Sequence, residues 1–111
     1  MVGGEGMNKY RNIKTTVDGI RFDSKREAER YSELKLLERA GIITDLKLQP
    51  KFELIPKHNG NRALTYIADF SYTEGGEKIV EDVKGMETKE FKIKKKLFEY
   101  FYPELKLKIV R

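Results

Sequence analysis

The stretch LTYIADFSYTEGGEKIVEDVK, residues 64–84, decides the fold because it predicts two strands joined by a tight turn. Gly75 and Gly76 mark the centre of the turn, since glycine readily adopts the positive φ angles of a short hairpin loop. A loop of two or four residues centred there places Asp69 directly opposite Asp82. An odd-length loop would shift the pairing by one residue and send these two acids to opposite faces.

The charges of the second strand, residues 78–84, sort by face because side chains two residues apart share a face. Asp82 and Lys84 lie on one face, whereas Glu81 lies on the other and is interpreted as structural. Opposed carboxylates repel each other, so fold stability does not require Asp69 to face Asp82. A divalent cation would convert that repulsion into ligation. Two interpretations therefore stay open, a metal site or an exposed face on which the lysine forms a salt bridge.

Upstream of this hairpin, the sequence predicts another hairpin and a helix. The dipeptide Asp18-Gly19 is typical of a two-residue turn between the strands KTTV and IRF. A helix over residues 25–40 follows, and Ser24 with Glu27 forms a capping box at its start. Its predicted core face consists of Ala28, Tyr31, Leu34 and Leu37. Glu27 falls inside the same arc, so it either only caps the helix by bonding the Ser24 backbone or also faces a site on the sheet.

The remaining segments complete a single mixed α/β domain. Residues 42–55 alternate in polarity but contain Pro50, which predicts an edge strand or a strand broken at that point. Residues 56–63 are predicted to form a loop and residues 64–72 a strand. A second helix begins near Thr88 and ends before Pro103, and a strand over residues 105–110 follows it in the sequence. Its predicted core side consists of Phe91, Leu97, Phe98 and Phe101. The predicted order is hairpin, helix, three strands, helix, strand.

The composition bounds the function classes. A chain of 111 residues with a net charge of +5 and a pI of about 9.3 favours a polyanionic partner, nucleic acid first and an anionic membrane surface second. The absence of cysteine excludes disulfides, thiolate zinc sites and cysteine nucleophiles, and fits the expected cytoplasmic location. The single histidine, His58, is interpreted as a loop residue. No apolar run reaches membrane-spanning length, so no insertion into a membrane is expected. Residues 1–8 are predicted to be a flexible leader, and residues 9–111 the domain.

The hairpin acids and lysine resemble the signature of the PD-(D/E)xK nuclease superfamily, an acid on one strand followed by an acid-x-Lys triplet on the next. The matching residues are Asp69 and then Asp82-Val83-Lys84. The chain departs from the pattern with Ala68 in place of proline, and with aspartate where glutamate is commoner. The order of elements over about residues 24–110 also resembles the superfamily core. The segments FDSKREAE, LQPKFEL, YIADFSY and VEDVKG resemble an uncharacterised family of small phage and prophage proteins assigned to that superfamily.

This resemblance implies a restriction-endonuclease-like core preceded by a β-hairpin, and a divalent-metal-dependent DNA endonuclease that hydrolyses phosphodiester bonds. Asp69 and Asp82 would ligate Mg²⁺ or Mn²⁺ together with the backbone carbonyl of Val83. Lys84 would orient the attacking water or stabilise the transition state. Many members of the superfamily add a glutamate from the first helix, and Glu27 matches that position.

Further residues are expected around this site. Gln49 matches a glutamine of the resembled family, and its side chain is expected to lie near the site. Lys94 falls on the core side of the second helix, where it either extends its charge to solvent or leans toward the acids or a substrate phosphate. Four other lysines form a basic face expected to contact the phosphate backbone, unless that face is simply solvated: Lys89, Lys92, Lys95 and Lys96.

Three functions remain in view. A chain this short leaves little room for a specificity domain, which favours a structure-selective or nicking endonuclease. A homodimer, which would supply two active sites, stays open beside a monomer. The alternatives are a non-catalytic nucleic-acid-binding protein on the same fold, and an interaction module whose charges serve solubility.

Overall fold

The computed structural model describes residues 14–111, and the predicted leader at residues 1–8 lies outside this part of the chain. Within it, neither helix is long and apolar enough to cross a membrane. In chain order, the elements are β1 (Thr15–Val17), β2 (Ile20–Phe22), α2 (Lys25–Arg39), β3 (Ile43–Leu48), β4 (Lys51–Ile55), β5 (Leu64–Ile67), β6 (Phe70–Glu74), β7 (Glu77–Val83), α3 (Lys89–Phe101) and β8 (Lys106–Val110).

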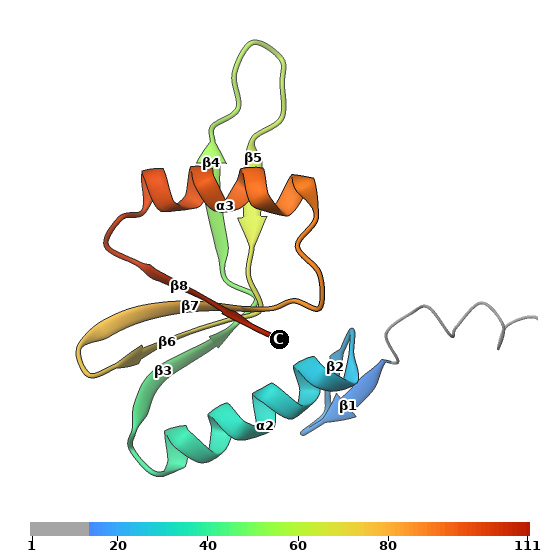
Figure 1. The fold of residues 1–111 in the computed structure, drawn as a ribbon, viewed down its shortest axis with the longest axis vertical. Coiled ribbons are helices and arrows are strands. Elements are labelled where there is room, and N and C mark those ends of the chain that lie inside the picture. The colour runs from blue at the N-terminus through green and yellow to red at the C-terminus, as the bar shows by residue number, and fades with distance from the viewer. Residues whose placement is uncertain (1–13) are drawn as a thin grey trace, which may run out of the picture.

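The centre of the fold is a four-stranded sheet with the order β3-β6-β7-β8 (Figure 1). Strand β6 is antiparallel to both neighbours, whereas β7 and β8 are parallel because α3 forms the crossover between them. Gly75 and Gly76 have φ angles of 59° and 81°, so the predicted two-residue turn is confirmed. In this register, Asp69 and Asp82 are the next opposed residues beyond the last ladder pair of β6 and β7.

Two stretches predicted as single strands are divided in the structure. Residues 42–55 form β3 and β4, as the predicted break at Pro50 allows, and residues 64–72 form β5 and β6. At the first break, Gln49 has a φ of 50° and Pro50 has no N–H for a ladder. The prediction of one continuous strand over 64–72 was wrong, because β5 follows β4 out of the sheet. These two strands pair with each other as a separate antiparallel hairpin.

Helix α2 and the β1–β2 hairpin cover one face of the central sheet. The turn of that hairpin, Asp18-Gly19, has the positive φ angles expected of it, 53° and 77°. The helix begins after Ser24, whose hydroxyl accepts a hydrogen bond from the Glu27 N–H at 3.0 Å, as the capping box predicts. The Glu27 carboxylate, however, accepts from the backbone N–H of Asp23 at 3.3 Å and not from that of Ser24. The predicted core face is confirmed, since Ala28, Tyr31 and Leu34 are buried and Leu37 is partly buried against the same cluster, and Glu27 is buried beside them.

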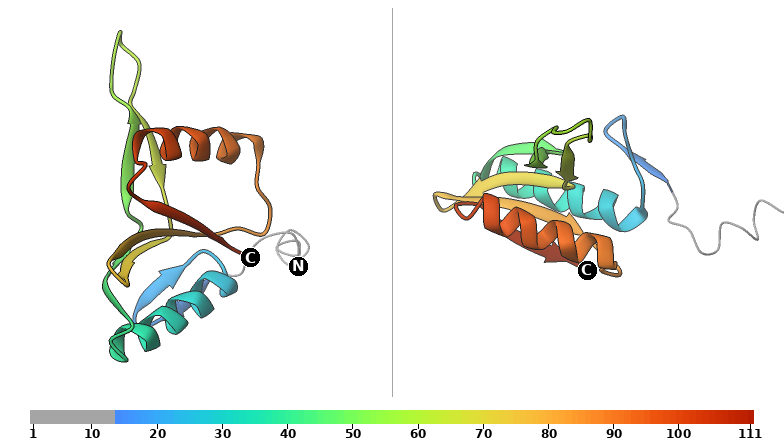
Figure 2. Two further views of the ribbon diagram at one scale, coloured as in Figure 1. Left: turned by 60° about the vertical axis from the view of Figure 1, so that its left-hand side comes forward. Right: turned by 90° about the horizontal axis from the view of Figure 1, so that it is seen from above.

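Helix α3 and the β4–β5 hairpin cover the other face, as the left view of Figure 2 shows. The hydroxyl of Thr88 caps the helix by accepting from the Phe91 N–H at 3.1 Å. Phe91 and Phe98 are buried, as predicted. The prediction that Phe101 faces the core was wrong, since its side chain is exposed. Tyr102 takes its place, with its ring stacked 5.3 Å from that of Phe98.

Two buried clusters therefore sandwich the sheet and make the chain a single α/β domain. The cluster under α2 consists of Phe22, Ala28, Tyr31, Leu34, Ile43, Phe70, Tyr72 and Ile79. The cluster under α3 consists of Leu54, Tyr66, Ala68, Val80, Phe91 and Phe98. The neighbours Ile79 and Val80 belong to different clusters, as the two-residue period of a strand requires.

Candidate functional site

Five of the predicted site residues line one cavity of about 200 Å³, called here the acidic cavity. It forms where the end of β7, the start of α2 and the bend between β5 and β6 meet. Its lining consists of Asp23, Ser24, Glu27, Asp69, Asp82, Val83 and Lys84. The space is large enough for several water molecules.

Asp82 is the most deeply buried acid of this cavity, with 2% of its surface exposed. The Tyr66 hydroxyl donates a hydrogen bond to Asp82 Oδ2 at 2.6 Å, and Lys84 Nζ lies 3.7 Å from the same oxygen. Burial, followed by hydrogen bonding with Asp69, raises the pKa of Asp82 to about 7. The hydrogen bond from Tyr66 and the charge of the half-exposed Lys84 therefore do not offset the rise in pKa that burial causes at Asp82.

Asp69 sits at the bend between β5 and β6, and its backbone is fixed on both sides. Its N–H donates to the Glu81 carbonyl at 3.1 Å, and its own carbonyl accepts from the Gln49 N–H at 2.9 Å. Its carboxylate accepts from the Val83 N–H at 2.7 Å. Burial and the nearby Glu27 carboxyl raise the pKa of Asp69 to about 6, although hydrogen bonds from its other neighbours oppose the rise.

Together, the two aspartates behave as a coupled pair. Each raised pKa lies close to neutrality, and each carboxyl interacts with the other. Adjacent carboxyls in a poorly solvated site retain a shared proton because both cannot ionise cheaply. We call Asp69 and Asp82 the acid pair.

Glu27 reaches the acidic cavity from the first turn of α2, where it is 8% exposed. Its inward direction, predicted from the helical arc, is confirmed. It both caps the helix and lies beside the acid pair, so the two predicted roles are compatible. The positive end of the helix dipole points to the same place, which favours negative charge there.

Lys84 connects the acidic cavity to a second one of about 230 Å³, called here the lysine groove. Its ammonium lies 4.7 Å from the centre of the Phe91 ring, which holds it by a cation–π contact. Lys94 lines the lysine groove but not the acidic cavity, and its ammonium lies 3.7 Å from Glu90. The other residues of the groove are Thr65, Tyr66, Ile67 and Thr88.

The remaining predicted residues lie around the site. Gln49 lines a third cavity of about 130 Å³ together with Glu27 and Asp69, so it adjoins the acid pair. The other α3 lysines do not line the acidic cavity. Lys89, Lys92 and Lys96 are exposed, and Lys95 is half-buried.

Glu81, the neighbour of Asp82, is fully buried but satisfied. Arg30 donates to both of its carboxylate oxygens, at 2.6 Å and 2.9 Å, and the Tyr72 hydroxyl donates to one of them at 2.7 Å. Hydrogen bonding to Glu81 also raises the pKa of the Arg30 guanidinium, so Arg30 stays charged over the whole accessible pH range. We call these three residues the tether, because they tie α2 to β7.

The donor set of the acidic cavity suits a hard divalent cation, which prefers carboxylate oxygens and water. Within residues 14–111, no three acidic, histidine or cysteine side chains stand ready as a metal cage. The Val83 N–H and the Tyr66 hydroxyl each donate a hydrogen bond to an oxygen of the acid pair. A cation would compete with these hydrogen bonds and with the shared proton.

Sequence reasoning missed two residues of this region, Tyr66 and Asp23. A continuous strand over 64–72 would place Tyr66 on the opposite face from Asp69, three residues away. The bend before β6 removes that constraint and allows both side chains to reach Asp82. Asp23 precedes the cap of α2, and only the position of this helix beside β7 could have indicated its role.

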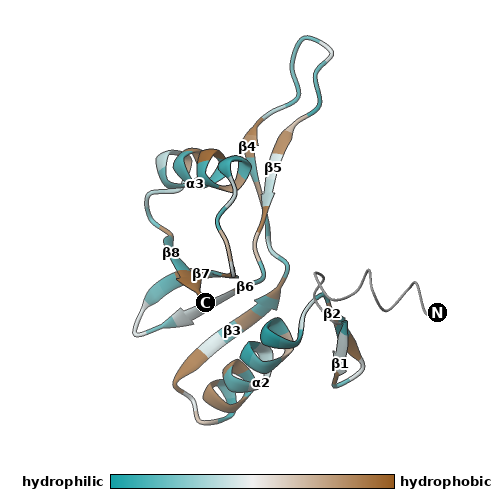
Figure 3. Ribbon diagram, turned by 45° about the vertical axis from the view of Figure 1, so that its right-hand side comes forward, coloured by the Kyte–Doolittle hydropathy of each residue, from teal (hydrophilic) through white to brown (hydrophobic). Residues whose placement is uncertain are grey.

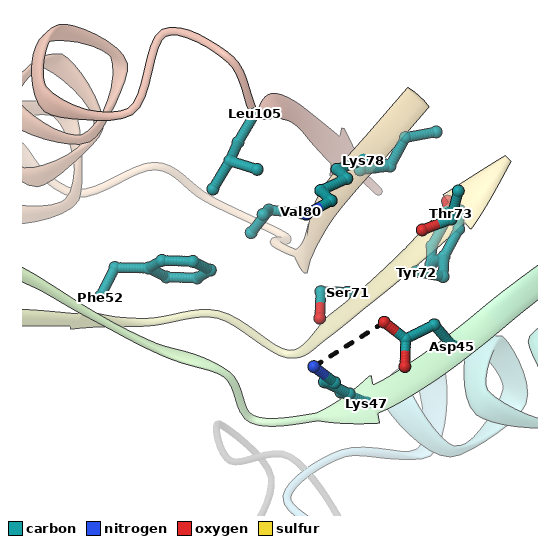
Figure 4. Close-up of a pocket in the computed structure, with 10 residues that line it drawn as sticks. Asp45, Lys47, Phe52, Ser71, Tyr72, Thr73, Lys78, Val80 and Leu105 are labelled. Atoms are coloured by element: carbon teal, nitrogen blue, oxygen red, sulfur yellow. Dashed lines mark ion pairs between the residues drawn. The ribbon is translucent and has the colours of Figure 1, made fainter. Parts of the chain in front are cut away.

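Another cavity, of about 160 Å³, lies at the opposite end of the β6–β7 hairpin (Figure 4). It contains a single acid, Asp45, whose carboxylate pairs with Lys47 at 3.7 Å. Ser71, Val80 and Phe52 form part of the remaining wall. This cavity lacks the grouped acids of the first one, so the acidic cavity is the candidate site.

Comparison with known proteins gives a family without an activity. The model of a family described as "Protein of unknown function (DUF1064)" matches residues 7–111. No curated protein and no solved structure matches the chain significantly.

Proposed function

This chain belongs to the DUF1064 family, and we propose that it is a divalent-metal-dependent DNA endonuclease that hydrolyses phosphodiester bonds. The observation that supports this proposal is the meeting of Asp69, Asp82, Glu27 and Lys84 around one cavity. The fold does not require Asp69 and Asp82 to face each other, because burial and mutual repulsion oppose their ionisation. A group of this kind is expected at a functional site.

The order α2-β3-β6-β7-α3-β8 also supports the proposal, since it matches the helix, three strands, helix and strand of the restriction-endonuclease-like core. In this interpretation, the β4–β5 hairpin is an insertion between the first and second strands of the core. Asp69 would then lie directly before β6 and Asp82 near the end of β7, the two central strands of the sheet, as the resemblance implies.

Each residue has a role in the proposed reaction. Asp69, Asp82 and the Val83 carbonyl would hold Mg²⁺ or Mn²⁺, with Glu27 as a further ligand directly or through water. When bound, the metal would supply an activated water and neutralise charge on the scissile phosphate. Lys84 would hold the attacking water or a phosphate oxygen, a role consistent with its place between the two cavities.

The decisive experiment incubates the full chain with supercoiled plasmid and with branched DNA in Mg²⁺ or Mn²⁺. We expect nicking or structure-selective cleavage, and a loss of at least ~100-fold in rate for Asp82→Asn, since a catalytic metal supplies several kcal/mol. Asp45→Asn is the matched control, because it makes the same change outside the acidic cavity. The proposal fails if the wild type leaves every substrate intact, or if Asp82→Asn cleaves at the wild-type rate.

A second candidate is a nucleic-acid-binding protein on the same fold with an idle site. The hydrogen bonds that occupy both aspartates favour it, because an idle site has no need to release them. Salt-dependent DNA binding without cleavage in either metal would select this candidate.

A further inference from the structure

The β4–β5 hairpin with its connecting loop, residues 51–67 and called here the arm, projects beyond the rest of the domain (Figure 1). Its lower half packs against α3 through Phe52, which lies 5.0 Å from the Phe98 ring in an edge-on contact. Its upper half, residues 56–62, is exposed throughout. This exposed part, called here the tip, contributes nothing to either buried cluster.

The tip is built as a closed turn. His58 and Asn61 exchange two backbone hydrogen bonds, at 3.3 Å and 2.6 Å. Asn59 and Gly60 between them have φ angles of 45° and 77°, which is the two-residue turn that Asn-Gly favours. The His58 ring nitrogen Nδ1 also lies 2.9 Å from the Pro56 carbonyl oxygen. The side chains of the tip therefore project from a defined scaffold.

The tip is hydrophilic, as Figure 3 shows by its colour, and its composition makes it cationic. Lys57 and Arg62 are its charged residues, and no acid occurs anywhere between Glu53 and Asp69. Within the described part of the chain, neither cation forms an ion pair. On the body of the domain, by contrast, several cations are paired with carboxylates, including Arg30. An exposed pair of uncompensated cations suits a polyanion and not the interior of a membrane.

The arm is anchored at the candidate site. At its base, the Ala68 N–H donates to the Pro50 carbonyl at 3.1 Å, one residue before Asp69. Thr65 and Ile67 of β5 line the lysine groove together with Lys84. The lysine groove therefore joins the acidic cavity, with which it shares Lys84, to the strand β5 that leads to the tip.

We propose that the arm enters a groove of double-stranded DNA and positions the duplex whose phosphate occupies the acidic cavity, a proposal that rests on the proposed function. The major groove of B-DNA accepts a two-stranded β-ribbon. At about 3.3 Å per residue, the extended chain from Ile67 to Gly60 spans up to about 23 Å, or about seven base pairs of duplex. Lys57 and Arg62 contact phosphates, and the amides of Asn59 and Asn61 reach base edges or sugars.

The test measures binding separately from cleavage. Asp82→Asn protein in EDTA is titrated against a fluorescent duplex by anisotropy over a range of salt concentrations. We expect the added changes Lys57→Gln and Arg62→Gln to weaken binding about tenfold or more, and to reduce the slope of log K against log salt by about 1 per cation. The matched control is Arg39→Gln with Lys108→Gln, which removes one arginine and one lysine that are exposed on α2 and β8.

The outcomes separate the two proposals. If the tip variant binds like the control while the wild type cleaves DNA, the arm proposal is overturned and the nuclease stands. If the tip determines the salt slope but no DNA is cleaved, the arm stands and the nuclease fails. If the tip matters only for a single strand of the same length, insertion into a duplex groove is overturned. If the wild type binds no DNA, both fail.

Discussion

The tether and the acid pair contain neighbouring residues of one strand, yet the fold treats them in opposite ways. Glu81 is fully buried and receives three hydrogen bonds, two of them from the Arg30 guanidinium. Asp82 is equally buried, but it faces another carboxyl, and its pKa is raised to about 7. The same backbone therefore presents a compensated acid on one face and an uncompensated acid on the other.

This difference indicates which acid serves the fold. A buried carboxylate that is matched by a guanidinium holds two elements in place, here α2 against β7. A buried carboxyl beside a second carboxyl is unfavourable unless a cation or a proton joins them. The tether also fixes α2, one turn beyond Glu27, so the compensated region positions the uncompensated one.

The largest expected effect is on stability and comes from breaking the tether. Arg30→Met leaves Glu81 buried without its cation, and we expect it to lower the free energy of unfolding by about 3–5 kcal/mol. Asp82→Asn should leave stability at neutral pH unchanged or higher, because it removes a carboxyl that ionises poorly. Urea denaturation of both variants measures this contrast.

The double variant Arg30→Met with Glu81→Met sharpens this result. Replacing both partners by apolar groups of similar size is often close to neutral, so the double variant should recover most of the loss. An equal loss in single and double variants would mean that packing at Arg30, and not the unpaired charge, sets the cost. Equal destabilisation by Arg30→Met and Asp82→Asn would remove the distinction between the two regions.

The next effect concerns pH and metal. Because both aspartates have raised pKa values in the folded state, the folded protein binds more protons than the unfolded chain above about pH 4. Their stabilising contribution is therefore complete below that pH and is lost as the pH rises through 6 to 7. We expect the melting temperature of the wild type to fall over this range relative to Asp69→Asn/Asp82→Asn.

Millimolar Mn²⁺ should reverse this loss. A cation that binds only the folded protein raises the melting temperature, and it binds the acid pair only when protons leave. The shift should be small at about pH 5, large at about pH 8, and absent from the double asparagine variant. A shift that is independent of pH or persists in that variant would place the metal elsewhere.

Much of this contrast could be predicted from the sequence, because strand periodicity and turn chemistry are local. The Gly75-Gly76 turn determines the register, and the register separates Glu81 from Asp82 and brings Asp69 opposite the latter. The inward direction of Glu27 follows in the same way from helical spacing. These predictions depend only on residues that are close in sequence or paired across one turn.

The partners of the two acids could not be predicted, because they depend on tertiary placement. Arg30 is 51 residues from Glu81 and reaches it only because α2 lies against β7. Tyr66 reaches Asp82 only because the chain bends before β6, where polarity alone predicts a continuous strand. The arm could not be predicted for a related reason, because no local sequence pattern indicates that β4 and β5 leave the central sheet as a pair.

The smallest expected effect comes from the tyrosines on either side of β7, which form a matched pair. Tyr66→Phe removes a donor at 2.6 Å from Asp82, and Tyr72→Phe removes one at 2.7 Å from Glu81. Each should lower stability by about 0.5–1.5 kcal/mol. Because the Tyr66 hydroxyl opposes the rise in the pKa of Asp82, its loss should move the onset of Mn²⁺ stabilisation to higher pH. Tyr72→Phe should leave that onset unchanged, since Glu81 stays paired with Arg30. Melting curves in Mn²⁺ across pH check both, and equal shifts in the two variants would show that the faces of β7 are not independent.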